Sequence, residues 1–183
     1  MAENLFICDV MLQISPTHYL STIHYADAEE IFALLQSETI HRNLLQLPRP
    51  YTFAHALEWI DDNKDFEEGY PSPMNYAIRN QSGQFCGTIG FHFIDQKVAG
   101  HCAIGYWLGE AHWGQGIMTA AIQSIIHLAK EKHGLTSLEA DVFEWNEASK
   151  RVLLKHGFTP QSSLQKTKLD GTVVTAQRFI KML

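Results

Sequence analysis

The distribution of apolar residues predicts a strand followed by a well-marked amphipathic helix. Residues 104–108 are aliphatic or aromatic and carry no charge, which is typical of a mostly buried strand. After a short loop, apolar residues recur at Ile117, Ala121, Ile125 and Leu128. This spacing of three to four residues predicts one buried helical face. We therefore expect a strand-to-helix unit in the middle of the chain.

Three further helices are predicted from possible capping residues and from apolar periodicity. They are expected from Asp27 to about residue 36, at 53–63 after Thr52, and at 147–156 after Asn146. Alternating or continuous apolar runs between turn signals predict about seven strands. These are expected at 20–25, 74–79, 84–94, a segment ending at 108, 138–143, 158–164 and 173–181, with a turn at 96–100.

This order of elements predicts a single domain over residues 1–183, in the α/β (α+β) class. Three consecutive strands between residues 74 and 108 are expected to form an antiparallel meander. The strand–helix–strand unit at 101–143 is expected to be a right-handed parallel crossover. The result is a mixed, mostly antiparallel sheet with a central parallel pair and about four helices. Residues 1–18 are read as an irregular extension or an added strand.

Two glycines open the central helix and indicate a site for an anion. Gly114 and Gly116 precede the first apolar position, Ile117. The first N–H groups of a helix have no internal partner, and the helix dipole adds positive charge there. Glycines leave room for a bulky anion, so a phosphate or pyrophosphate cradle is predicted. A tight turn with close helix packing is the simpler alternative.

Composition excludes several classes of function. The formal net charge is −6, from 14 basic and 20 acidic residues, which leaves no electrostatic footprint for nucleic acid. No apolar run approaches the length of a membrane span, and no secretory signal is recognised, so no membrane partner is expected. Cys8, Cys86 and Cys102 are odd in number and widely spaced, which fits reduced thiols in a cytoplasmic protein.

No metal site is predicted from the sequence. The chain has 10 histidines, but none forms an H-x-x-x-H or H-E-x-x-H pair, and no cysteine accompanies them at zinc spacing.

Three segments together resemble the GNAT N-acetyltransferase superfamily, in its RimJ/RimL-like branch. They are Ile-Gly-Tyr-Trp-Leu at 104–108, Trp-Gly-Gln-Gly-Ile-Met-Thr at 113–119, and 146–158, which is similar to the family's N-x-x-S-x-x-V-x-x-x-x-G-F signature. The resemblance spans about residues 20–182. It implies a GNAT-like fold in which the central strand splays from its parallel neighbour. It also implies acetyl-CoA as cosubstrate, an amine acceptor, and a monomer or homodimer.

The resemblance also implies which residues hold the cofactor. Backbone N–H groups of residues 115–119 would bind the pyrophosphate, the strand end near 107–109 would pair with the pantetheine arm, and the side chain of Asn146 would bind that arm. The cofactor-binding residues expected on this basis are Trp107, Leu108, Gly109, Trp113, Gly114, Gln115, Gly116, Ile117, Met118, Thr119 and Asn146.

The chain departs from the branch where its general base is usual. The branch often has Glu just before the Ile-Gly-Tyr triplet, but this position is Ala103. His101 is our first candidate for the base, because it lies two residues away on the same side of a strand and histidine is the side-chain type suited to proton transfer near neutral pH. His92 and Glu139 are weaker candidates. Ser149 is the candidate proton donor to the leaving thiolate, by its family position.

Three functions remain open at this point. The first is an acetyl-CoA-dependent N-acetyltransferase that acts directly on an amine, either a protein or peptide α-amine or a small molecule. The second, motivated by Ala103, is a non-catalytic acetyl-CoA-binding module with the same fold. The third is a dinucleotide-binding oxidoreductase. A Rossmann fingerprint would require a third small residue where Thr119 stands, and the acid Glu139 would be misplaced at the start of its strand.

Overall fold

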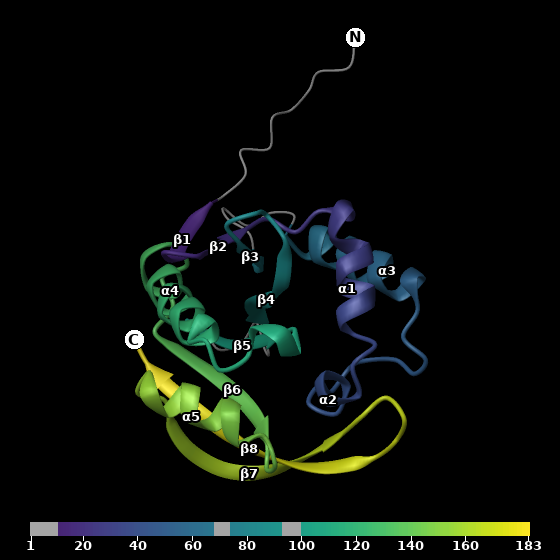
Figure 1. The fold of residues 1–183 in the computed structure, drawn as a ribbon. Helices are drawn as coiled ribbons and strands as arrows, with labels where there is room; N and C mark the ends of the chain where they lie inside the picture. The colour runs from purple at the N-terminus through teal and green to yellow at the C-terminus, as the bar shows by residue number, and fades with distance from the viewer. Residues whose placement is uncertain (1–10, 68–73, 93–99) are drawn as a thin grey trace.

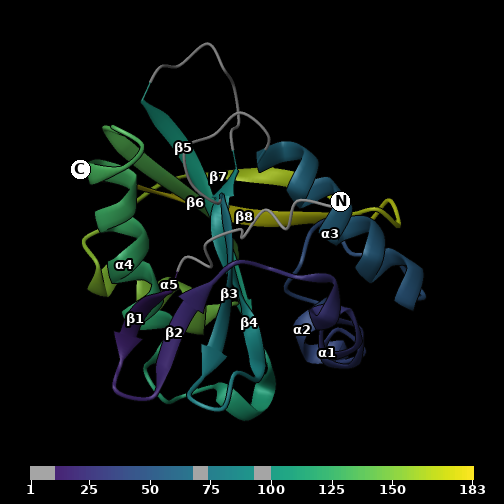
Figure 2. The ribbon, with the colours of Figure 1, turned by 90° about the horizontal axis from the view of Figure 1, so that it is seen from above.

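The computed structural model describes residues 11–67, 74–92 and 100–183. Part of the predicted N-terminal extension, the end of the strand predicted at 84–94 and the turn expected before Gly100 lie outside the described residues. One sheet runs through the described part of the molecule, and helices cover both of its faces (Figures 1 and 2). Within these ranges, no helix combines the length and the apolar character that crossing a membrane requires.

The sheet has eight strands in the described part, in the order β1-β2-β3-β4-β5-β6-β8-β7. Among these described strands only β5 and β6 are parallel, and every other neighbouring pair is antiparallel. The additional strand, β1, comes from the segment read as an extension or an added strand. The bounds are β1 Leu12–Ser15, β2 His18–Ser21, β3 Asn75–Asn80, β4 Phe85–His92, β5 His101–Leu108, β6 Ser137–Phe143, β7 Thr159–Thr167 and β8 Val173–Met182.

The described residues form five α-helices, which lie in two groups, one on each face of the sheet (Figure 2). The first group is α1 (Ala28–Leu34), α2 (Glu38–His41) and α3 (Phe53–Glu67), and the second is α4 (Ile117–Glu131) and α5 (Glu147–Lys155). The predicted cap of α3 is confirmed, because Thr52 Oγ1 accepts a hydrogen bond from the backbone N–H of His55 at 3.3 Å. The short helix α2 was not predicted, since four residues carry no helical periodicity.

Each face of the sheet has its own apolar core. The predicted stripe of α4 is buried and packs against strand residues that include Ile89 and Leu138. On the other face, residues of α1 and α3 pack with Phe85 and with Trp107 of β5. Successive residues of β5 therefore contact different cores, as the alternation of a strand requires.

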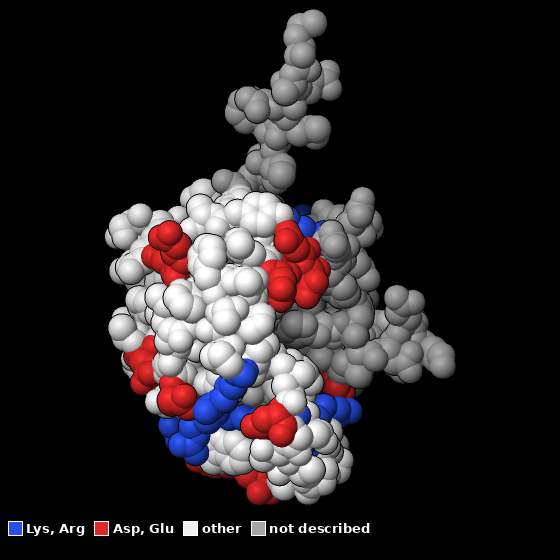
Figure 3. Space-filling model, turned by 90° about the vertical axis from the view of Figure 1, so that its right-hand side faces the viewer, with Lys and Arg blue, Asp and Glu red and all other residues white. Residues whose placement is uncertain are grey.

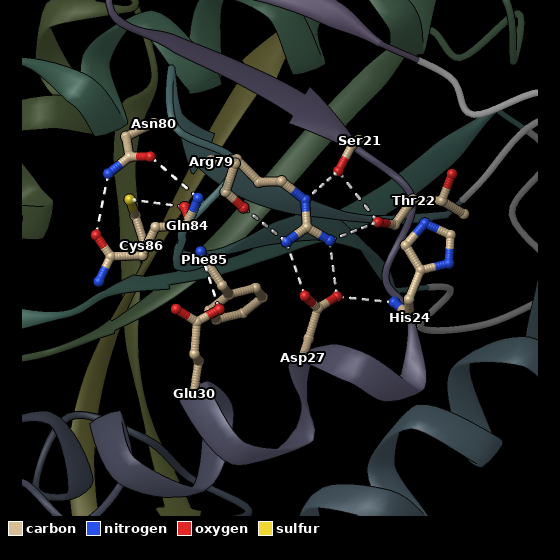
Figure 4. A network of polar contacts seen from close by, with 11 residues as sticks. Ser21, Thr22, His24, Asp27, Glu30, Arg79, Asn80, Gln84, Phe85 and Cys86 are labelled. Carbon is tan, nitrogen blue, oxygen red and sulfur yellow. Dashed lines mark hydrogen bonds and ion pairs between the residues drawn. The ribbon is translucent and has the colours of Figure 1, made fainter.

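A buried ion pair joins α1 to the sheet and corrects one prediction (Figure 4). Asp27 does not cap α1 with its side chain. Its carboxylate instead receives two hydrogen bonds from Arg79 of β3, at 2.7 and 2.8 Å, and one from the backbone N–H of His24 at 2.8 Å. Arg79 Nε also donates to Ser21 Oγ at 2.7 Å. Because Asp27 and Arg79 are both buried, pairing outweighs capping for this carboxylate.

The turn between β7 and β8 reaches back to the segment that follows α2. Lys168 Nζ donates to the carbonyl of Arg42 at 2.8 Å. Trp145, ahead of α5, donates from Nε1 to Asn43 Oδ1 at 3.0 Å. Figure 3 shows this side of the molecule, where most of the visible Lys and Arg side chains gather in the lower half. These contacts hold the segment around Asn43 against the C-terminal half of the sheet.

The parallel pair β5–β6 separates part-way along its length. Its register joins His101 to Ser137, Cys102 to Leu138 and Ala103 to Glu139, and no later pair follows. On its other edge β5 stays paired with β4 as far as Leu108. Residues 104–108 therefore have one edge that does not pair with β6, which confirms the splayed central pair that the resemblance implied.

Candidate active site

A cavity of about 680 Å³ opens where β5 and β6 separate. Its walls come from β5, β6, the N-terminal ends of α4 and α5, and the segment after α2. Of the eleven residues predicted to hold a cofactor, all but Gly109 and Gln115 line it. Residues that are distant in the sequence thus meet in one space.

The loop before α4 presents bare backbone donors to this cavity. Gly114 and Gly116 have φ angles of 74° and 78°, in the left-handed region that favours glycine. A Cβ placed on either would meet nothing within 4 Å, so the space beside them is clear. Among the described residues, no atom accepts a hydrogen bond from the backbone N–H groups of 114–119. These donors and the helix dipole can bind an anion.

Two side chains hold this loop in place without filling the cradle. Gln115 turns its side chain back and donates from Nε2 to the carbonyl of Ala111 at 2.8 Å. Trp113 donates from Nε1 to the carbonyl of Leu108 at 2.8 Å, while its ring stays partly exposed. Trp113 therefore fastens the loop to the end of β5. The structure gives Gln115 a positioning role through its side chain and leaves its backbone N–H for a ligand.

Asn146 and Ser149 meet at the start of α5. Asn146 Oδ1 accepts a hydrogen bond from the backbone N–H of Ser149 at 3.2 Å, which confirms the predicted cap. The Ser149 hydroxyl is 2.7 Å from the hydroxyl of Tyr106 on β5. Burial raises the pKa of Tyr106, although the contact with Ser149 lowers it. Tyr106 therefore stays protonated, and it can support Ser149 as a proton donor.

Sequence reasoning did not assign a chemical role to Tyr106. The signal was present in the Ile-Gly-Tyr triplet, but only the folded chain shows that its hydroxyl reaches α5.

His101 lies in the half of β5 that is still paired with β6, and it does not line the cavity. Its Nδ1 is 2.8 Å from Ser137 Oγ, and its Nε2 is 2.9 Å from Glu139 Oε2. Glu139 is buried and also contacts Arg178 at 3.2 Å. His101 stays a prediction as the general base, but the structure places it in a polar cluster beside the site rather than in it.

His92 lies nearer to the split than His101 does. An ideal Cβ on Gly105, which lines the cavity, would lie 2.6 Å from His92 Nε2, so the imidazole packs directly against this glycine. Desolvation lowers the pKa of His92. The ring is therefore neutral at neutral pH, which is the state that a proton acceptor needs.

The single carboxylate that lines the cavity among the described residues is Asp141, and it is already engaged. Arg178 donates to both of its oxygens at 2.8 and 2.9 Å, and Lys166 lies at 2.7 Å. Burial raises the pKa of Asp141, but the hydrogen bonds from Arg178 and Lys166 outweigh it and hold the pKa below its usual range. Such a carboxylate is a weak proton acceptor.

Comparison with known proteins identifies the family. The family described as Acetyltransferase (GNAT) domain matches residues 19–159. The chain belongs to the GNAT acetyltransferase family. The curated relatives include the uncharacterized N-acetyltransferase YoaA of Bacillus subtilis (strain 168), 36% identical over 142 residues, which are 76% of this chain and 77% of that protein.

Another GNAT relative has a named acceptor. It is the ribosomal-protein-serine acetyltransferase of Escherichia coli (strain K12), 33% identical over 160 residues, which are 80% of this chain and 88% of that protein. Among solved structures, RimL, a ribosomal L7/L12 alpha-N-protein acetyltransferase in complex with coenzyme A, matches with a TM-score of 0.81 at 20% identity. That match covers 95% of this chain and 98% of the other. It shows that the GNAT fold extends over nearly the whole chain.

Proposed function

We propose that the protein is an acetyl-CoA-dependent N-acetyltransferase that transfers the acetyl group directly to an amine. One observation carries this proposal: the N–H groups of 114–119, which donate to no described protein atom, and the free edge of β5 open into the same cavity. The first would bind the diphosphate of acetyl-CoA, and the second would pair with its pantetheine arm. Asn146 would bind that arm from α5. Solved neighbours carry coenzyme A or acetyl-CoA, which supports this assignment.

The reaction needs a neutral amine and a proton for the leaving group. The amine attacks the thioester carbonyl, the C–N bond forms, the C–S bond breaks, and the amine loses one proton while the CoA thiolate gains one. N–H groups on the free edge of β5 near Leu108 would stabilise the oxyanion. The Ser149 hydroxyl would donate to the thiolate, with Tyr106 supporting it through their 2.7 Å contact.

The state of Asp141 favours an acceptor of low pKa. With that carboxylate engaged by Arg178 and Lys166, no free carboxylate among the described cavity residues can remove a proton from a lysine-like ammonium. An alkyl ammonium has a pKa of about 10.4, whereas an α-amino group has a pKa of about 7.7–8.0 and is partly neutral at pH 7. We therefore propose a peptide or protein N-terminal α-amine as the acceptor. The relative that acetylates a ribosomal protein supports this choice.

An acceptor comparison with detection of the released CoA thiol tests the proposal. Initial rates would be measured for a peptide with a free α-amine and for its N-blocked, lysine-containing version. We expect the free α-amine to react faster. Faster turnover of the blocked peptide would exclude the proposed acceptor. The second candidate is a non-catalytic CoA-binding module, because the described cavity wall has no free carboxylate. Acetyl-CoA binding with no thiol release for any amine would favour this alternative.

Two variants distinguish the candidate bases. Neither histidine lines the cavity, but His92 packs on Gly105, which does. Both ring nitrogens of His101 are engaged, by Ser137 and Glu139. We therefore propose His92 as the proton acceptor ahead of His101. His92→Ala should then lower kcat by about 100-fold, at the lower end of general-base effects. His101→Ala should have a much smaller effect. The reverse order would return the role to His101, and equally small effects would indicate that solvent accepts the proton of the amine.

A further inference from the structure

A cluster of two histidines and one cysteine lies beside the cavity and has no part in the proposed reaction. It consists of His18 on β2, Cys86 on β4 and His112 in the 3₁₀ turn Glu110–His112. This turn precedes the glycine loop, by which we mean residues 113–116 before α4. One potential ligand atom from each residue lies within 4.8 Å of the other two. Side chains from three separate elements thus converge on one point.

The chain holds Cys86 at this point through an irregularity in β4. Ile78 of β3 pairs with Gly87, and Arg79 pairs with Phe85, so Cys86 has no partner in the β3 ladder. A bulge of this kind changes the direction of a side chain relative to a regular strand. The carbonyl of Cys86 accepts a hydrogen bond from the backbone N–H of Gly109 at 2.8 Å. This bond fastens the cysteine to the segment that leads into the turn of His112.

The histidine rings have nitrogens available for a ligand. His18 Nδ1 is 2.9 Å from Thr17 Oγ1, which orients the ring and leaves Nε2 on the other side. Within the described ranges, no hydrogen-bond partner is found for His18 Nε2 or for either ring nitrogen of His112. The two rings meet edge to face, with centroids 6.5 Å apart and an interplanar angle of 79°. Such an outer hydrogen bond to one nitrogen is typical of histidines that bind metal through the other.

We propose that His18, Cys86 and His112 form a binding site for a thiophilic divalent cation, with Zn²⁺ as its representative. Two imidazoles and one thiolate suit Zn²⁺, and they are poor ligands for Mg²⁺ or Ca²⁺, which prefer oxygen. On binding, the Cys86 thiol gives its proton to solvent, and its sulfur becomes the third protein ligand. A water molecule would take the fourth position.

The geometry requires only a small adjustment. Tetrahedral Zn²⁺ with bonds of about 2.0–2.1 Å to nitrogen and about 2.3 Å to sulfur separates its ligand atoms by roughly 3.4–3.6 Å. The three atoms are already within 4.8 Å of one another. His112 is half-buried in a short turn, so its side chain can move toward His18 and Cys86, which are both buried in the sheet. His112 also lines the acetyl-CoA cavity, so a bound ion would fix the turn next to the glycine loop.

Cobalt substitution tests this site directly, with a readout that does not depend on catalysis. Tag-free protein would be treated with a chelator, dialysed and titrated with Co²⁺, which reports thiolate ligation by a charge-transfer band in the near ultraviolet. We expect one equivalent to bind with this band, and Zn²⁺ to displace it. Cys86→Ser should abolish the band. Cys102→Ser and Cys8→Ser are matched controls that should keep it.

A second variant keeps the test decisive if Cys86→Ser does not fold. His112→Ala changes a half-buried residue in a turn, and it should weaken Co²⁺ and Zn²⁺ binding by more than the roughly 10- to 100-fold expected for loss of an outer partner. Thr17→Val, which removes that partner from His18, should weaken binding by about this 10- to 100-fold factor. The exposed His127→Ala is the control. Absence of stoichiometric binding, a band that persists in Cys86→Ser, or equal loss in His127→Ala would overturn the proposal.

Discussion

The helices α4 and α5 both begin at the cavity, but their first turns are built differently. At α4 the capping position is Gly116, no side chain caps the helix, and the cradle N–H groups have no acceptor in the described structure. At α5 the side chain of Asn146 accepts from the N–H of Ser149. We call the start of α4 open, because no described atom accepts from its first N–H groups, and the start of α5 closed, because a side chain caps it.

Packing explains why α4 tolerates an uncapped start. It has 15 residues, seven of which are buried, whereas α5 has nine residues and buries only Leu153. A missing cap costs about 0.5–2 kcal/mol, which the apolar face of a long buried helix readily offsets. The short, exposed α5 depends more on its cap. Of these two helices, the one with free first-turn donors is the one that tertiary packing, rather than capping, holds in place.

The largest expected effect on CoA binding comes from closing the open helix start. Gly116→Ala places a methyl group in the clear space of the cradle and strains a residue at φ 78°. Loss of one hydrogen bond to a charged group, about 1.5–3 kcal/mol, should weaken CoA binding about 10- to 100-fold. Isothermal titration calorimetry measures this change directly.

Gly134→Ala provides the matched control for that variant. Gly134 has a φ of 60°, and a Cβ there would also meet nothing within 4 Å, but it lies beyond the other end of α4 and does not line the cavity. Both variants should lose about 1–2 kcal/mol of stability from backbone strain. Equal loss of CoA affinity in both variants would refute the proposal that the N–H groups at the start of α4 bind the diphosphate.

The next effect concerns the hydroxyl pair that joins β5 to the start of α5. Ser149→Ala removes the proposed donor to the thiolate and should lower kcat by about 100-fold, with little change in CoA affinity. Tyr106→Phe should have a smaller effect, because Tyr106 acts through Ser149. Steady-state rates with thiol detection, beside binding measurements, separate the two quantities. Ser124→Ala removes a hydroxyl on α4 that lies outside the cavity, and it is the control. An unchanged kcat in Ser149→Ala would remove this residue from the mechanism.

Opening the closed helix start gives a moderate effect on stability. Asn146→Ala should lower the free energy of unfolding by about 1 kcal/mol through loss of the cap. For a chain of this length, thermal unfolding should shift by about 2–4 °C per kcal/mol. Asn146→Ser should restore most of the stability, because serine also caps, but it should not restore the proposed contact with the pantetheine arm. If the serine variant recovers CoA affinity as well, the arm contact is not made by the asparagine amide.

The smallest effect is the pH dependence contributed by Asp141 on β6, the strand that leads into α5. Its pKa in the folded protein is below the ordinary value of 3.8. Its contribution to stability is therefore fully present above that value, and it is lost as pH falls toward the lower folded pKa. Thermal unfolding of wild-type protein and Asp141→Asn should converge as the pH falls through this window. A constant difference between them at all pH values would contradict the assignment.

Features that depend on neighbouring residues could be predicted from the sequence. The buried stripe of α4, the cap at Asn146 and the glycine loop all follow from local periodicity and backbone preference. The helix α2 and the strand β1 were missed as defined elements, because four-residue segments carry too little pattern. Local rules are therefore enough for most of the fold and for the glycine-containing loop at the start of α4.

Features that depend on long-range pairing could not be predicted from the sequence. Asp27 has a good capping position, but the buried guanidinium of Arg79 from a distant strand binds it instead. The alternation of β5 places His101 and Ala103 on one side, but only the register of β6 shows that Ser137 and Glu139 occupy that imidazole. The same reason explains why spacing rules missed the His18, Cys86 and His112 cluster.

The shortness of the β5–β6 register has a mechanical consequence for the whole sheet. Three residue pairs join these strands, against six between β4 and β5 and seven between β6 and β8. The N-terminal and C-terminal halves of the sheet are thus joined by its weakest central ladder. Amide hydrogens beside this ladder should exchange with solvent earlier than those of the flanking ladders. A ligand that pairs a polar chain with the free edge of β5 would bridge the two halves of the sheet and slow amide exchange in both.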